Sequence, residues 1–201
     1  MIIILFYIFY GAEREIRLFE QDEFIRDNIS KDDILIVSVG GNDIALKPNM
    51  STIWNMIKLM KMNFDSTIDK GPKYAWGMQY FIDLFKTRTT EYIEELTSKC
   101  KPKKIIVCLI YYPDEKTTGS WADRILGYLD YNKNPYRLQK VIYQIYKHAT
   151  TQIKIDGCEV IPCPMFKTLD GKNTKDYSQR VEPSEQGGDK LAGTFIKIAK
   201  L

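Results

Sequence analysis

The segment from Asp33 to Asp43 ends an apolar run with two glycines, an asparagine and an aspartate, Gly40-Gly41-Asn42-Asp43. The apolar run predicts a buried strand, and the glycines allow the backbone to turn sharply where that strand ends. Such a turn would present the Asn42 amide at the carboxyl edge of a sheet, where it can donate a hydrogen bond to a developing oxyanion. Asn-Asp after glycine is also a common turn signature. The pattern therefore predicts either an oxyanion donor or an ordinary turn.

A second stretch that could belong to a site runs from Val181 to Ala192 and reads V-E-P-S-E-Q-G-G-D-K-L-A. With the G-G-N-D turn, it makes the chain similar to the SGNH hydrolase superfamily, also called the GDSL hydrolases. The turn matches that family's G-x-N-D block, and Pro183, Ser184 and Gly187 match its D-x-x-H-P-s-x-x-G block. In the order and spacing of predicted strands, the resemblance covers nearly the whole chain.

The resemblance implies hydrolysis of a carboxylic ester through an acyl-serine intermediate, with no metal and no organic cofactor. Asn42 would be the oxyanion donor, with Gly41 and Asp43 beside it in the binding site. The backbone N–H of Gly11 would be a second donor, although a glycine that simply ends the first strand is an equal alternative. Glu182 stands at the position of the family's histidine and would take its place as the general base.

The chain departs from the family's pattern at the nucleophile and at the acid–base pair. It contains no G-D-S turn and no G-x-S-x-G elbow, so no nucleophilic serine is identified. We hypothesise that the strand carrying this serine lies upstream of the first residue, as in a truncated chain. Gln179 holds the position of the partner aspartate, and a glutamate such as Glu182, with an ordinary pKa near 4, is a weak base at neutral pH unless burial raises that pKa.

Other polar and aromatic residues are weaker candidates. The single histidine, His148, falls in a predicted helix, which is typical of a packed or surface side chain. Asp176 and Arg180 are expected to be solvated residues of a loop, and the alternative is that they pair with each other. Tyr112 and Trp121 follow the third predicted strand and could line an acyl or sugar pocket, or could instead cover the edge of the core.

The function that these residues favour is an SGNH-type esterase acting on a small-molecule ester or an acylated sugar. The alternative is a non-catalytic SGNH-like binding module that has lost its triad, which the glutamate in place of histidine favours. A nucleotide-binding domain is disfavoured, because no G-x-G-x-x-G or P-loop lysine motif follows any predicted strand.

Composition excludes several other classes of protein. The 201 residues are 44% apolar, enough to bury one sizeable core, and we expect a single domain over residues 1–201. With 29 basic and 26 acidic side chains the net charge is +3, and no basic stripe indicates a nucleic-acid partner. The four cysteines show no metal-ligand or disulfide spacing, so we expect no metal site, reduced thiols and a cytoplasmic location.

The apolar N-terminus, Met1 to Tyr10, is too short to span a bilayer and lacks the basic residues that open a signal peptide. Its isoleucines and aromatics predict a buried strand instead. The sequence therefore predicts no membrane span.

Strands and helices are predicted to alternate along the chain. A domain built from such βαβ units has a mostly parallel sheet with helices on both faces, so we expect a three-layer α/β/α sandwich of the flavodoxin-like, SGNH hydrolase type. Ligands of such sheets bind beyond the carboxyl ends of the strands, where the candidate residues above would meet. Two stretches, Asn63 to Gly77 and Asp114 to Asn134, are expected as irregular loops. The predicted strands are Ile2 to Phe9, Ile34 to Val39, Ile105 to Ile110 and Glu159 to Pro162, and the predicted helices are Tyr80 to Lys99, Tyr136 to Gln152 and Glu185 to Lys200.

Overall fold

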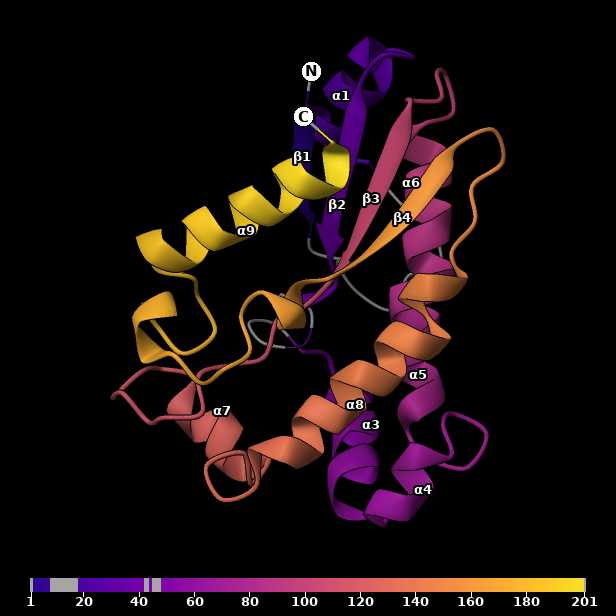
Figure 1. Ribbon diagram of the computed structural model, residues 1–201. Coiled ribbons are helices and arrows are strands. Elements are labelled where there is room, and N and C mark those ends of the chain that lie inside the picture. The colour runs from indigo at the N-terminus through magenta and orange to yellow at the C-terminus, as the bar shows by residue number, and fades with distance from the viewer. Residues whose placement is uncertain (1, 8–17, 42–43, 45–47, 201) are drawn as a thin grey trace.

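The computed structural model describes residues 2–7, 18–41, 44 and 48–200 (Figure 1). Its four strands form one parallel sheet in the order β1-β2-β3-β4. The α/β fold class with a parallel sheet is therefore confirmed. The bounds are β1 Ile2–Tyr7, β2 Ile34–Val39, β3 Lys104–Leu109 and β4 Glu159–Pro164, so β2 coincides with its prediction and the ends of the other strands lie within two residues of theirs.

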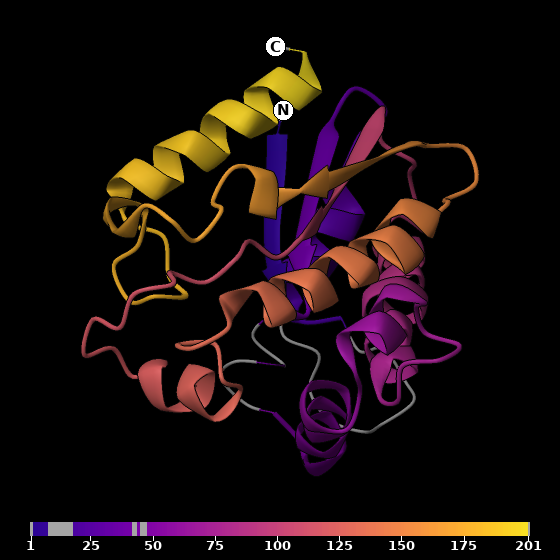
Figure 2. The ribbon, with the colours of Figure 1, turned by 60° about the horizontal axis from the view of Figure 1, so that its bottom comes forward.

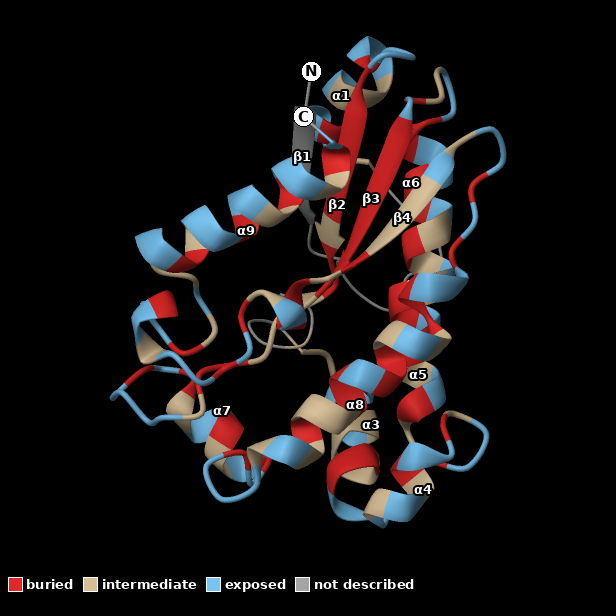
Figure 3. Ribbon diagram, in the orientation of Figure 1, coloured by how far each residue is buried: buried red, intermediate tan, exposed pale blue. Residues whose placement is uncertain are grey.

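Helices cover both faces of this sheet. On one face, α1 (Glu20–Asn28) and α6 (Thr89–Leu96) pack against the side chains of Leu35, Val37 and their neighbours. On the other face, α9 (Glu185–Ala199) packs against Ile36 and the residues around it. Both central strands are buried as a result, as Figure 3 shows. Alternate side chains of β2 thus enter two separate cores, the arrangement expected of a three-layer sandwich.

A further group of helices lies beyond the carboxyl edge of the sheet rather than against its faces (Figures 1 and 2). These helices share a third hydrophobic core, which continues from the sheet through Leu109 and includes Ile142 and Phe81. They place a second layer of apolar side chains opposite the loops where the strands end. The group consists of α3 (Met50–Lys61), α4 (Asp65–Asp69), α5 (Met78–Ile82), α7 (Asp123–Tyr128) and α8 (Pro135–His148).

The expectation of two irregular loops is wrong in part. The stretch from Asn63 to Gly77 contains α4, and the stretch from Asp114 to Asn134 contains α7. Helices of five or six residues are too short to show the three-to-four-residue periodicity that identifies longer ones. Burial of Ile68 and Leu126 in the core beyond the sheet edge stabilises these short helices.

The helix predicted from Tyr80 to Lys99 is observed from Met78 to Leu96, and its geometry changes within it. Between α5 and α6, residues Asp83–Arg88 form a π-helical segment, η1. This segment buries Leu84 and Phe85, and the ring of Phe85 lies beside Gly40 at the end of β2. None of the helices described is both long enough and apolar enough to cross a membrane.

Candidate functional site

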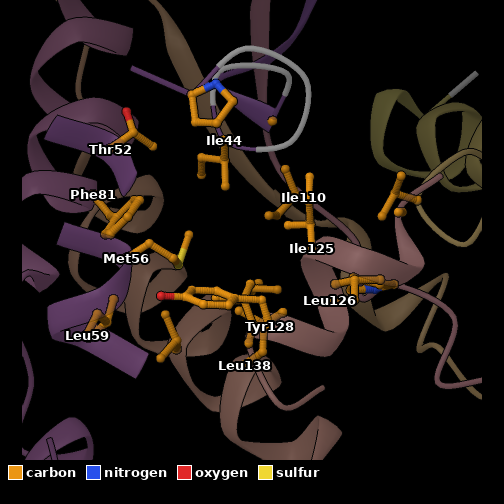
Figure 4. A pocket seen from close by; sticks show the side chains of 18 of the residues that line it. Ile44, Thr52, Met56, Leu59, Phe81, Ile110, Ile125, Leu126, Tyr128 and Leu138 are labelled. Carbon is orange, nitrogen blue, oxygen red and sulfur yellow. The ribbon is translucent and has the colours of Figure 1, made fainter. Parts of the chain in front are cut away.

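A cavity of about 750 Å³ lies at the carboxyl edge of the sheet, between the ends of β2 and β3 and the helices beyond them (Figure 4). Gly41 follows β2, Ile110 follows β3, and both line the cavity together with residues of α3, α7 and α8. In Figure 4, Thr52 and Met56 of α3 face Ile110 and Ile125 across the opening. The cavity thus occupies the place where open parallel sheets bind ligands.

The two glycines of the turn after β2 lie close to neighbouring side chains. Gly40 has φ +86°, a left-handed conformation that disfavours any residue with a side chain. A Cβ at this position would also lie 2.8 Å from the ring of Phe85 in η1. At Gly41 a Cβ would lie 3.1 Å from Ile110. The π-helical segment is therefore packed closely against the turn. Position 40 requires glycine both for its left-handed backbone conformation and for the lack of space beside Phe85.

We expect Gly40→Ala to lower the free energy of unfolding by about 1–2 kcal/mol through backbone strain and by about 1–3 kcal/mol more through overpacking against Phe85. Gly119→Ala is the matched control, because Gly119 also has a positive φ, +76°, but has nothing within 4 Å of the position that a Cβ would take. Urea unfolding of the two variants separates the two costs. Equal losses in both would show that Phe85 does not restrict the turn.

Three of the sequence candidates, Asn42, Asp43 and Gly11, lie outside the described residues. The roles that the resemblance implies for them remain predictions. Gly41, beside Asn42 in the sequence, lines the cavity.

Glu182 lies at the mouth of the same cavity. Its side chain is exposed, and its Oε1 accepts a hydrogen bond of 3.2 Å from Nε1 of Trp121, which also lines the cavity. Beside it, the Tyr111 hydroxyl donates a 2.7 Å hydrogen bond to the carbonyl oxygen of Val181. Burial, and secondly the nearby Glu182 carboxylate, raise the pKa of Tyr111, so its phenol stays protonated and keeps this hydrogen bond.

Arg180 holds the loop that carries Glu182, and the prediction that it is solvated is wrong. Its side chain is fully buried, and its backbone has φ +52°. Nε and one terminal nitrogen, Nη2, donate to the carbonyl oxygen of Asp114, at 3.1 and 2.9 Å. The other terminal nitrogen, Nη1, donates at 2.9 Å to both Asp123 and Asn132. Arg180 thus ties the Glu182 loop to the segment after β3, to the start of α7 and to the turn that follows α7.

Asp176 is also buried rather than solvated, and its partner is not Arg180. Its carboxylate accepts hydrogen bonds from Lys190 at 2.7 and 2.8 Å and from Gln186 at 2.6 Å. Both partners lie on α9, so Asp176 joins the loop before Glu182 to the helix after it. Sequence alone places Asp176 four residues from Arg180, and only the fold shows that the two side chains point to different elements.

The residues that match the second family block have evident structural roles. Ser184 is the N-cap of α9, because its hydroxyl accepts a 3.2 Å hydrogen bond from the amide of Gly187. Pro183 pairs with Tyr177 in an isolated antiparallel bridge. The block therefore forms the transition from the Glu182 loop into the last helix.

The aromatic candidates divide between the cavity and the core. Tyr111 and Trp121 line the cavity. The ring of Tyr112 instead stacks on Phe166, with centroids 5.0 Å apart. Met56 of α3 also lines the cavity. The helix that carries it, α3, is not among the helices predicted from the sequence, so the wall of the cavity that α3 forms was not predicted.

The remaining nucleophilic and basic side chains are arranged as follows. Ser38 of β2 lines the cavity and is in register with Cys108, which is in register with Cys163. All four cysteines are free thiols. His148, at the end of α8, packs against Gly71, and burial lowers the pKa of its imidazole. Among the described residues, no group of three or more histidine, cysteine or acidic side chains could hold a metal ion.

Comparison with known proteins identifies no relative of this chain. No protein-family model, curated protein or solved structure matches the chain. The resemblance to SGNH hydrolases therefore depends on the sequence of the two blocks alone.

Proposed function

We propose that the chain is an SGNH-type ester hydrolase whose substrate is a small-molecule carboxylic ester or an acylated sugar, acting in the cytoplasm. The observation that supports this proposal is that the two matching blocks meet at one cavity. Gly41 of the first block and Glu182 of the second both line it, although they are far apart in the sequence. The carboxyl edge of an open parallel sheet is where ligands of such folds bind, so both blocks lie where a catalytic site is expected.

In the proposed reaction, a serine hydroxyl attacks the ester carbonyl while Glu182 accepts its proton. The Asn42 amide stabilises the oxyanion of the tetrahedral intermediate. Glu182 then returns the proton to the departing alcohol, and water hydrolyses the acyl-serine by the same steps. Ser38 is the serine that the described lining of the cavity offers for a direct test as the nucleophile.

The test is hydrolysis of p-nitrophenyl acetate by the purified chain and by Asn42→Ala, Glu182→Gln and Ser38→Ala. We expect Asn42→Ala to lower kcat by about a hundredfold or more, the usual effect of losing one oxyanion donor. Glu182→Gln removes the proton acceptor and should lower kcat as well. Glu185→Gln, an equally exposed glutamate in the first turn of α9, is the matched control and should retain activity.

A folded sample with no hydrolysis above buffer would overturn the esterase proposal and favour the binding module. The exposure of Glu182 favours this alternative. In the described part of the chain, moreover, the side-chain carboxylate of Glu182 accepts its hydrogen bond from Trp121 and not from a serine, threonine or cysteine. Hydrolysis that Ser38→Ala leaves unchanged would exclude Ser38 as the nucleophile.

A further inference from the structure

The walls of the cavity beside Glu182 are mostly aliphatic. Met56 extends from α3, Ile125 from α7 and Ile142 from α8, and half of the other lining residues are also isoleucine, leucine, valine or methionine. Figure 4 shows Met56 directed toward the middle of the cavity. Such walls offer a ligand dispersion contacts and removal of apolar surface from water, but few directional interactions.

Burial of the lining changes from one end of the cavity to the other. Leu59 and Phe81 are at most 1% exposed and form its inner wall. Ile53, Ile125 and Tyr128 are at least 39% exposed and lie at its mouth, between α3 and α7. A ligand that enters between these helices therefore passes from a partly solvated opening into a dry interior.

Four of the polar side chains that line the cavity are hydrogen-bonded within the protein, and two others, Arg124 and Tyr128, are exposed at its mouth. The Thr52 hydroxyl lies 2.6 Å from the Tyr80 hydroxyl, and Tyr111 donates to a backbone carbonyl oxygen. Trp121 donates to Glu182 at the mouth. A sugar ring inside the cavity would leave several hydroxyl groups unpaired, which is unfavourable in a buried site. An aliphatic chain has no such groups.

We propose that this cavity binds the aliphatic chain of a lipid-type molecule, with the polar end of that molecule at the mouth beside Trp121 and Glu182. The proposal names the acyl part of the substrate and to that extent rests on the proposed function. In an acylated sugar, the acyl chain would fill the cavity and the sugar would stay at the polar mouth. Binding of the chain itself requires no hydrolysis.

The test measures binding of sodium hexanoate and sodium decanoate, each below its micelle concentration, by isothermal titration calorimetry. Burial of each added methylene tightens binding about fourfold, so decanoate should bind at least about a hundredfold more tightly than hexanoate. Met56→Trp fills the cavity and should weaken decanoate binding by about tenfold or more. Met62→Trp, at the exposed end of α3 and outside the cavity, is the matched control and should bind as the natural chain does.

A second pair of variants keeps the test decisive if Met56→Trp fails to fold. Ile125→Trp changes an exposed residue at the mouth, and Ile196→Trp changes an equally exposed isoleucine on α9, away from the cavity. We expect the first to weaken decanoate binding and the second to leave it unchanged. Equal affinity for the two fatty acids, no binding of either, or equal loss in cavity and control variants would overturn the proposal.

The two proposals fail in different ways. Decanoate binding without ester hydrolysis would leave the cavity assignment in place and remove the esterase. Hydrolysis of p-nitrophenyl acetate without any dependence of binding on chain length would retain the esterase and overturn the aliphatic-chain site.

Discussion

Arg180→Met should lower the free energy of unfolding by about 3–5 kcal/mol, the usual effect of removing one partner from a buried ion pair. The guanidinium is fully buried, and its loss would leave the Asp114 carbonyl oxygen without this donor and the Asp123 carboxylate without its cation, although that carboxylate also accepts a hydrogen bond from the Gly119 amide. Urea unfolding followed by circular dichroism measures this change. Arg124→Met, an identical replacement at an exposed position on α7, should change the free energy of unfolding by less than about 0.5 kcal/mol.

Arg180→Lys tests whether geometry matters as well as charge. A lysine ammonium cannot donate along both directions that the planar guanidinium serves, toward Asp114 and toward Asp123 with Asn132. We therefore expect this variant to be less stable than the natural chain but more stable than Arg180→Met. If Arg180→Met unfolds at the same urea concentration as Arg124→Met, then Arg180 does not anchor the Glu182 loop.

Gly187→Ala should also be strongly destabilising, by about 3 kcal/mol, the upper end of the range for overpacking. A Cβ on Gly187 would overlap the carbonyl oxygen of Asp176, and that oxygen already accepts a hydrogen bond from the Ser184 amide. Relief of the overlap would require the start of α9 to move away from the loop that precedes Glu182. The thermal midpoint and the free energy of unfolding should fall together.

The adjacent glycine provides the control. Gly188 has nothing within 4 Å of the position that a Cβ would take, and it lies inside α9. Gly188→Ala should therefore stabilise the chain by about 0.5–1 kcal/mol, because alanine loses less backbone entropy in a helix than glycine does. A destabilised Gly188→Ala, or an unaffected Gly187→Ala, would contradict the packing described at this junction.

The sequence identified the regular elements that carry a strong local pattern. The apolar run from Ile34 to Val39 predicted β2, and the apolar positions after Pro135 predicted α8, because burial of a continuous run or of one helical face is visible in the order of the residues. Alternation of strands and helices predicted the parallel sheet. Short helices such as α4, and the π-helical segment at Phe85, have no comparable signal, because packing between distant segments stabilises them.

Of the candidate site, the sequence predicted only that it would lie at the carboxyl edge of the sheet. The sequence by itself determined that a glycine turn follows a buried strand and that Glu182 precedes a helix. The tertiary structure decided that Gly41 and Glu182 line one cavity, that Met56 and Ile125 form its aliphatic walls, and that Arg180 is buried. The physical reason is that a residue's own type and neighbours set its local conformation, whereas the solvation and partners of a side chain depend on segments that meet only after the chain has folded.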